Sequence, residues 1–289
     1  MSEMKNVNLK NAESKGFKLR KALKKNKSLL IGSIIVIILL TIMIVSFFYT
    51  PFDPNGMNIV DRFKSPDSTY IFGTDNFGRD ILSRIMEGAK TAFFVGSVSV
   101  GIALVIGGVI GAVAGYFGGW IDELFMRLID ALMAFPGILI AIMFIAVFGA
   151  GMVNTTIALG IMGIPTFARV SRSGFIQYRE FEFVKAAKSI GANPVRIIAI
   201  HILPNVISVL IITSSIAFAS AILSESALSY LGLGVQPPDA SWGRMLNEAQ
   251  SYLSKAPWYA IAPGFMITLT VLGFNLLGDG IQDALDPRK

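Results

Sequence analysis

The stretch "LLIGSIIVIILLTIMIVSFFY", residues 29–49, decides the class of this protein. Its 21 residues include no charged side chain, and as an α-helix the run would be about 31 Å long. The hydrocarbon core of a bilayer is about 30 Å thick, so the run predicts a membrane-spanning helix. The three aromatic residues at its end are typical of a membrane–water interface.

A cleaved signal peptide is the alternative for this region, because a basic segment, residues 1–28, precedes the apolar run. The run is longer than a typical signal core, and no small-x-small cleavage pattern follows it. We therefore expect residues 1–28 to form a basic cytoplasmic tail and residues 29–49 to form an uncleaved first transmembrane helix.

The rest of the chain has the same character. Of its 289 residues, 53% are hydrophobic and 15% are charged, and the mean hydropathy of +0.63 is one that soluble domains rarely reach. Four further uncharged runs lie between Lys90 and Asp122, Asp130 and Arg169, His201 and Glu225, and Lys255 and Asp279. The second of these is too long for one helix, and "FGAGMVNTT" at 148–156 predicts a turn within it. We expect an all-α, polytopic membrane protein with six transmembrane helices.

Lysine and arginine counts predict the orientation of these helices. Residues 1–28 hold nine basic and two acidic residues, which places this segment in the cytoplasm. Six spans return the C-terminus to the same side, and the basic loop 169–205 also faces inward. Segments 50–90 and 225–256 are near neutral or acidic and are expected outside. Anionic lipid accounts for the basic clusters, so nucleic-acid binding is not expected.

The loop segment "FVKAAKSIGANPVRIIAIHILPN", residues 183–205, is unusually polar for this chain. The apolar residues at i, i+3, i+4 and i+7 predict one helix face: Phe183, Ala186, Ala187 and Ile190. Gly191 is suited to a helix C-terminal cap, and Asn193 with Pro194 is typical of a new helix start. This hairpin either docks a partner closely against its small residues or rests on lipid headgroups.

"KAAKSIG", followed by nine residues and then "HILP", resembles the EAA loop of ABC-transporter permeases. The family pattern is Glu-Ala-Ala, three residues, Gly, nine residues and Ile-x-Leu-Pro, with Lys185 in place of the Glu and His201 in place of the Ile. The resemblance implies that loop 180–205 forms a short helix in a cleft of a cytoplasmic ATPase. The docking residues it implies are Glu182, Lys185, Ala186, Ala187, Gly191, Leu203 and Pro204, with Glu182 one turn from the missing carboxylate position.

Three further stretches narrow the resemblance: "FGTDNFGRDILSRIMEGAKTAF" (72–93), "YFGGWIDELFMRLIDALMAFPGILIAI" (116–142) and "LSYLGLGVQPPDASWGRML" (228–246). All are similar to the C-type permease subunit of oligopeptide and dipeptide importers, and nickel and metallophore importers share them. The resemblance implies a type I ABC importer permease fold with its core at 91–285, in a bacterial cytoplasmic membrane. It also implies partners: a homologous second permease, two cytoplasmic ATP-binding subunits, an extracytoplasmic substrate-binding protein and a peptide cargo.

No glycine-rich loop ending in Lys-Ser or Lys-Thr occurs, so ATP and Mg²⁺ are expected in the partner ATPases and no cofactor in this chain. A catalytic triad, a metal cluster and paired acids are also missing, which argues against an enzyme. The glycines spaced by four predict close helix packing: Gly107, Gly111, Gly115 and Gly119. Cysteine is absent and His201 is the only histidine, a poor set for nickel or zinc, so His201 is expected at an interface.

The uncharged runs contain no carboxylate, which argues against the alternative of a six-helix secondary transporter. Asp130 is expected to pair with Arg127 on the same helix. Glu225 either lines the outer mouth of a pathway or snorkels from a span end. Pro136 and Pro204 are candidate bends.

The outer segments predict two more features. Asp75 is a plausible helix cap, and the apolar stripe Ile81, Leu82, Ile85 and Met86 predicts an amphipathic helix along the outer surface, within segment 50–90. Trp242 is expected at the membrane interface or as a contact for a docking protein. Substrate-binding residues are not identifiable from the sequence.

Overall fold

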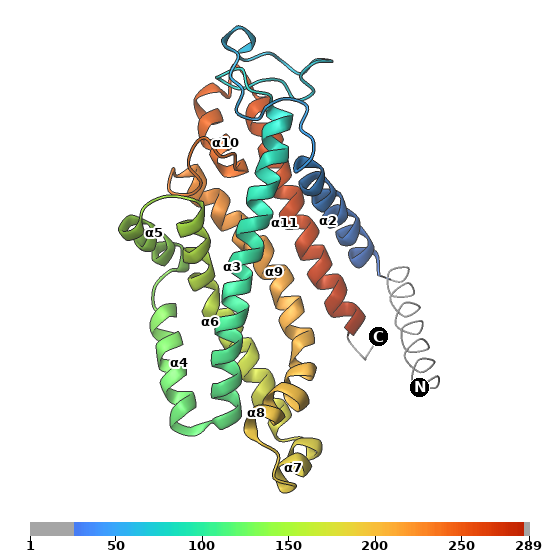
Figure 1. Cartoon of the computed structure of the whole chain (residues 1–289), viewed down its shortest axis with the longest axis vertical. Coiled ribbons are helices and arrows are strands. Elements are labelled where there is room, and N and C mark those ends of the chain that lie inside the picture. The colour runs from blue at the N-terminus through green and yellow to red at the C-terminus, as the bar shows by residue number, and fades with distance from the viewer. Residues whose placement is uncertain (1–25, 286–289) are drawn as a thin grey trace.

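The structure, a computed structural model, describes residues 26–285 and is almost entirely helical over that range. Long helices run side by side and give the molecule an elongated shape, with α10 at one end and α7 at the other (Figure 1). Within the described residues, four helices are long and apolar enough to cross a membrane: Lys27–Ser46 (α2), Ile81–Phe117 (α3), Pro194–Tyr230 (ending in α9, Leu203–Tyr230) and Trp258–Ala284 (within α11, Trp258–Leu285). The all-α, multi-pass class is confirmed.

The third predicted span is not one helix. α4 (Gly119–Met133) and α5 (Gly137–Phe148) meet at 82°, because residues 134–136 break the helix at Pro136, which lacks a backbone N–H. Counted together, the bent pair brings the apolar spans to five. α6 (Met152–Arg179) has 28 residues but a more polar sequence, so its membrane crossing stays a prediction. The predicted turn at 148–156 is confirmed between α5 and α6.

The sequence predicted a separate amphipathic helix along the outer surface, and this prediction is wrong. Its residues form the first turns of α3, which has 37 residues and is about 55 Å long, so that it extends well beyond a bilayer core of about 30 Å. The cap is Asp80, whose side chain accepts from the Ser83 N–H at 2.8 Å, rather than Asp75. Asp75 instead accepts from backbone N–H groups of the preceding turn, including that of Phe77 at 2.8 Å.

At the α10 end, loops from residues 50–80, with the short turn η1 (Ile59–Asp61), cover the ends of the long helices. α10 (Trp242–Ala249) packs on α3, α9 and α11, and the short turn η3 (Gln250–Tyr252) follows it. Trp242 was expected at a surface, but it is only 1% exposed, and its Nε1 donates to the Ile85 carbonyl at 3.1 Å. The indole is buried because Gly88 of α3 leaves room for it.

At the α7 end, α6 leads into α7 (Glu182–Ser189) and the single turn α8 (Pro194–Arg196). A π-helical turn at Ile197–Ile202 (η2) then joins α9. Pro204 lies two residues beyond the last residue of this turn. Residues Pro194–Tyr230 form one continuous span, so the predicted bend at Pro204 stays a prediction.

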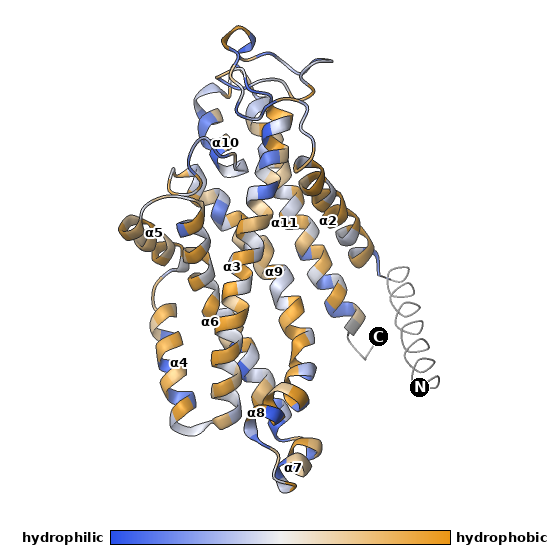
Figure 2. Cartoon of the chain, viewed as in Figure 1, coloured by the Kyte–Doolittle hydropathy of each residue, from blue (hydrophilic) through white to orange (hydrophobic). Residues whose placement is uncertain are grey.

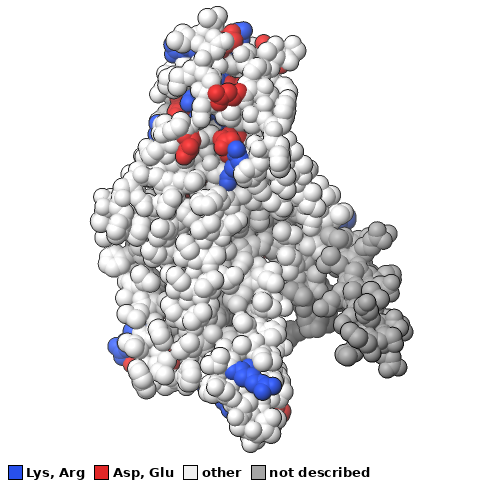
Figure 3. Space-filling view, in the orientation of Figure 1, with Lys and Arg blue, Asp and Glu red and all other residues white. Residues whose placement is uncertain are grey.

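Hydropathy and charge divide the molecule into three zones. The middles of the helices are mainly hydrophobic, and the polar colours gather at the two ends (Figure 2). Charged side chains on the visible face follow the same division, and the band between the ends shows almost none (Figure 3). This band is what a lipid bilayer requires of a membrane-spanning surface.

α3 and α6 make the most extensive contact of the described helix pairs, and glycines of α3 allow their backbones to approach closely. A Cβ atom at Gly107, Gly111 or Gly115 would lie 2.5, 2.2 and 2.7 Å from the carbonyl oxygens of Ile164, Ala168 and Arg172 respectively. The two backbones therefore touch at every turn over three turns, as the four-residue spacing predicts. Gly119 is an exception, because α3 ends at Phe117 and nothing lies within 4 Å of a Cβ at Gly119, whose φ is +56°. Its predicted packing role is wrong.

Candidate functional site

The loop after α6 forms the predicted hairpin. α7 ends at Ser189, and Gly191 follows the C-cap residue Ile190 with a φ of +78°. The Ala192 N–H donates to the Ala187 carbonyl at 3.1 Å, which closes the end of the helix. The Asn193 side chain accepts from the Val195 N–H at 2.9 Å, and Pro194 takes the first helical position. The two caps set a defined corner between α7 and α8.

One face of α7 packs against its own chain. Val184 and Ala187 are buried, at 0% and 6% exposure, in a cluster with Phe175 of α6 and Ile197 and Ile202 of η2. Ala187 was predicted to share an outward docking face with Phe183, Ala186 and Ile190, and that is wrong for Ala187. Val184 and Ala187, which are three residues apart, form the buried inner face of α7. They attach the hairpin to α6 and α9.

An adjacent face of α7 carries exposed apolar side chains. Phe183 is 43% exposed and Ile190 is 85% exposed, and Ala186 between them is also exposed. Phe183 contacts Phe181 edge to face, at 5.9 Å between ring centroids. We call Phe183, Ala186 and Ile190 the tip patch. Apolar side chains grouped on a rigid, exposed hairpin mark a contact surface.

The charged residues of the hairpin are exposed. Lys185, which stands where the EAA pattern has a carboxylate, pairs with Glu182 at 3.1 Å, so a carboxylate is present beside that position. Both side chains are largely exposed, and such surface pairs contribute little to stability. Leu203 and Pro204 are exposed at the start of α9. His201 is half-buried in the π-helical turn, where its carbonyl accepts from the Asn205 side chain at 2.7 Å.

Arginines of α6 connect the hairpin region to α3 and α4. Arg172 binds Asp122 of α4 through two hydrogen bonds of 2.5 and 2.6 Å, and Arg179 donates to the Gly115 carbonyl at 3.0 Å. Asp130 pairs with Arg169 at 2.7 Å rather than with Arg127, which corrects the pairing expected from the sequence. The salt bridge of Arg127 is to Glu123. Ion pairs between residues far apart in the chain therefore connect α4 to α6.

The α10 end contains a buried ionic network that was not predicted from the sequence. Arg79 pairs with Asp75 at 2.5 Å and with Glu248 of α10 at 2.8 Å, and Arg84 lies 4.0 Å from Glu248. Burial opposes ionisation of Glu248, but the guanidinium groups of Arg79 and Arg84 outweigh it, so the pKa of Glu248 lies below its ordinary value. The partners are 169 residues apart in the sequence, and no local pattern relates them.

Glu225 also differs from expectation. It is 1% exposed, and its carboxylate accepts from the Ser229 hydroxyl at 2.6 Å and the Ser226 hydroxyl at 3.4 Å. It is therefore neither a snorkelling end residue nor part of an open mouth. Within residues 26–285, no group of three or more His, Cys, Asp or Glu side chains is placed to hold a metal ion.

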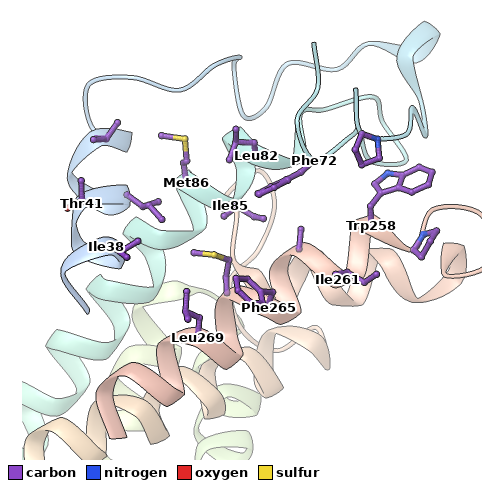
Figure 4. A pocket seen from close by; sticks show the side chains of 16 residues that line it. Ile38, Thr41, Phe72, Leu82, Ile85, Met86, Trp258, Ile261, Phe265 and Leu269 are labelled. Atoms are coloured by element: carbon purple, nitrogen blue, oxygen red, sulfur yellow. The ribbon is translucent and has the colours of Figure 1, made fainter. Parts of the chain in front are cut away.

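An apolar groove of about 800 Å³ lies between α2, α3 and α11, near the α10 end (Figure 4). Its walls include Ile38, Phe72, Leu82, Trp258 and Phe265. The other lining residues are also apolar except for Thr41, which contributes one hydroxyl group. We call it the α2 groove. Its position among membrane-spanning helices and its lining suit hydrocarbon and do not suit a polar cargo.

These features define a class of protein: a multi-pass helical membrane protein with an exposed hairpin between two long helices. A solved structure of the MetNI methionine ABC transporter, in an inward-facing conformation, shares this fold. Its TM-score is 0.57 at 15% identity, over 71% of this chain and 98% of that chain. The type I importer permease fold is confirmed.

The sequence relatives are closer. The chain is 44% identical over 268 residues to the dipeptide transport system permease protein DppC of Alkalihalophilus pseudofirmus, covering 93% of this chain and 88% of the relative. It is 41% identical to the glutathione transport system permease protein GsiD of Pectobacterium atrosepticum, over 93% and 89%. A putative peptide transport system permease protein of Brucella abortus is 40% identical, over 92% and 90%.

Residues 107–289 match the family described as "Binding-protein-dependent transport system inner membrane component". The match covers more than half of the chain, and the chain belongs to this family. It is the permease of a binding-protein-dependent ABC importer. The alternative of a self-sufficient secondary transporter is not favoured.

Proposed function

We propose that this permease imports dipeptides or short oligopeptides and that its α7 hairpin docks onto a cytoplasmic ATPase. The observation that carries the docking proposal is the tip patch, in which Phe183, Ala186 and Ile190 are exposed while Val184 and Ala187 hold the hairpin to the rest of the chain. An apolar surface on a firmly seated element suits a cleft in a second protein, because docking then buries apolar area without first ordering a loop.

The peptide cargo is supported by the relatives, whose names specify dipeptide, glutathione and peptide transport. The nickel or metallophore alternative has no supporting observation in the described residues. In this proposal a homologous second permease supplies the other half of the pathway, two ATP-binding subunits supply hydrolysis of Mg-ATP, and an extracytoplasmic binding protein delivers the cargo. Both termini and the α7 end lie in the cytoplasm.

Co-purification tests the docking. Phe183→Asp combined with Ile190→Asp introduces two charges into the apolar contact, and ATPase recovery with the permease should fall at least tenfold. Val60→Asp is the matched control: Val60 is 88% exposed, close to the 85% of Ile190, but lies at the α10 end. ATPase recovery equal to wild type in the double variant would refute the proposed docking.

Orientation and cargo are tested separately. The chain has no cysteine, so a single cysteine introduced at the exposed Ser189 reports one position. It should react with an impermeant thiol reagent only after the membrane is opened, and reaction in intact cells would place α7 outside and contradict the proposal. For the cargo, mass spectrometry of the ligand that co-purifies with the cognate binding protein should find a peptide; a metal chelate would favour the alternative.

A further inference from the structure

A second hollow, of about 410 Å³, lies between α3, α6 and α9, three helices that pack on one another (Figure 1). It differs from the α2 groove in its polar groups. Four hydroxyl-bearing residues line it: Ser99, Thr166, Thr213 and Ser220. They come from the middle parts of the three helices, and no charged side chain is part of the lining. We call this space the hydroxyl hollow.

The four hydroxyl groups differ in their partners. Ser99 donates to the Gly96 carbonyl at 3.2 Å, and Thr213 donates to the Val209 carbonyl at 2.9 Å. Thr166 and Ser220 are exposed, and within the part of the chain that the structure describes their hydroxyl groups have no hydrogen-bond partner. Two unsatisfied donors therefore face the same space from two different helices.

Other exposed threonines of the spanning helices behave differently. Thr41 of α2 donates to the Ile37 carbonyl at 2.8 Å, and Thr268 of α11 donates to the Gly264 carbonyl at 2.9 Å. A hydroxyl surrounded by lipid turns back to its own helix in this way, because hydrocarbon offers no other partner. Thr166 and Ser220 leave the same bond unused, so their hydroxyl groups are available to a polar occupant of the hollow.

The two hollows therefore suit different occupants. The α2 groove holds one hydroxyl, that of Thr41, and this donor is already bonded within its helix. An apolar space of this kind stays dry. The hydroxyl hollow presents unpaired donors beside apolar walls that include Met162 and Ile216. Small polar spaces with hydrogen-bonding groups hold water or a polar ligand.

We propose that the hydroxyl hollow is this chain's part of the translocation pathway and binds an uncharged, hydrogen-bonding stretch of the cargo, such as a peptide backbone. This inference rests on the proposed import of peptides. A hydroxyl group both donates and accepts, so Thr166 and Ser220 match the carbonyl and the N–H of an amide. With no charge in the lining, this half of the pathway favours neither acidic nor basic side chains. Met162 adapts its shape to different apolar side chains.

The test uses the complete importer in proteoliposomes, with radiolabelled alanyl-alanine as the probe and the binding protein supplied outside. Thr166→Val with Ser220→Ala removes both hydroxyl groups with little change of shape. ATP-driven uptake per assembled complex should fall about fivefold for each lost hydrogen bond, while ATPase recovery stays at the wild-type level. The matched control is Thr268→Val, whose hydroxyl is bonded to its own helix, and its uptake should equal that of the wild type.

A cysteine at position 166 gives a readout that a merely structural role would not move. It should react with a small charged thiol reagent, and alanyl-alanine with the binding protein and ATP should slow the reaction. If uptake by the wild-type importer requires both ATP and the binding protein, the proposed function is supported, regardless of the results for the variants. If that uptake is present, an undiminished rate in the double variant, or a cysteine at 166 that does not react, overturns the assignment of the hollow.

Discussion

Replacing Gly111 by alanine tests the contact between α3 and α6 most directly. The added Cβ would lie 2.2 Å from the Ala168 carbonyl oxygen and 2.7 Å from the Arg172 nitrogen. Relief of this clash requires the backbones to separate by about 1 Å, since a carbon and a carbonyl oxygen normally approach to about 3.3 Å. The Ser171 Cβ also lies 2.7 Å away, and none of these three atoms can be moved by rotating a side chain.

The expected loss of stability combines two destabilising terms and one stabilising term. Overpacking in a close contact costs about 1–3 kcal/mol, and replacing glycine by alanine inside a helix stabilises by about 0.5–1 kcal/mol. The neighbouring hydrogen bond from Ser171 to the Gly108 carbonyl, 2.8 Å long, would also weaken, at about 1 kcal/mol. We expect Gly111→Ala to lower the free energy of unfolding by about 1–3 kcal/mol.

Gly101→Ala is the matched control, because Gly101 lies in the same helix and nothing lies within 4 Å of its added Cβ. It should be neutral or stabilising by up to about 1 kcal/mol. At roughly 2–4 °C per kcal/mol, thermal unfolding of the detergent-purified permease should give the Gly111 variant a lower Tm than the Gly101 variant by about 2–16 °C. Equal Tm values for the two variants would show that the α3–α6 contact is looser than the structure has it.

Two further predictions concern the ends of the molecule. The pKa of Glu248 is lower in the folded protein than its ordinary value of 4.5, so its contribution to stability is complete above about pH 4.5 and is lost as the pH falls through the folded value. Proteolysis of residues 50–80 should therefore accelerate at acid pH, and a Glu248→Gln variant with the same pH profile as the wild type would contradict this. Ala187→Trp should lower the Tm because Ala187 is buried, whereas Ala186→Trp should leave the Tm unchanged and reduce ATPase recovery. Equal effects of the two substitutions on Tm would refute the division of α7 into an inner and an outer face.

The differences between the sequence predictions and the structure share a cause. The helix caps at Gly191 and Asn193, which depend on neighbours within about four residues, were predicted correctly, whereas the cap predicted at Asp75 lies at Asp80. The errors lie where a side chain's environment is set by a distant segment. Trp242 has an interface composition but is covered by α3, and Asp130 has a suitable partner at Arg127 but binds Arg169 of another helix. The outer stripe at 81–86 was predicted as a surface helix because its continuation into α3 has no sequence marker.

By itself, the sequence determined that the chain is a multi-pass helical membrane protein and that residues 183–205 form a capped hairpin, because bilayer thickness and helix capping act on contiguous residues. It also determined that Gly107, Gly111 and Gly115 of α3 permit a close neighbour. Only the tertiary structure decided which helix that neighbour is, which face of α7 remains open, and which hydroxyl groups meet in one hollow. Those properties depend on pairs of residues far apart in the chain, whose approach is decided by packing and by the burial of polar groups rather than by any local pattern.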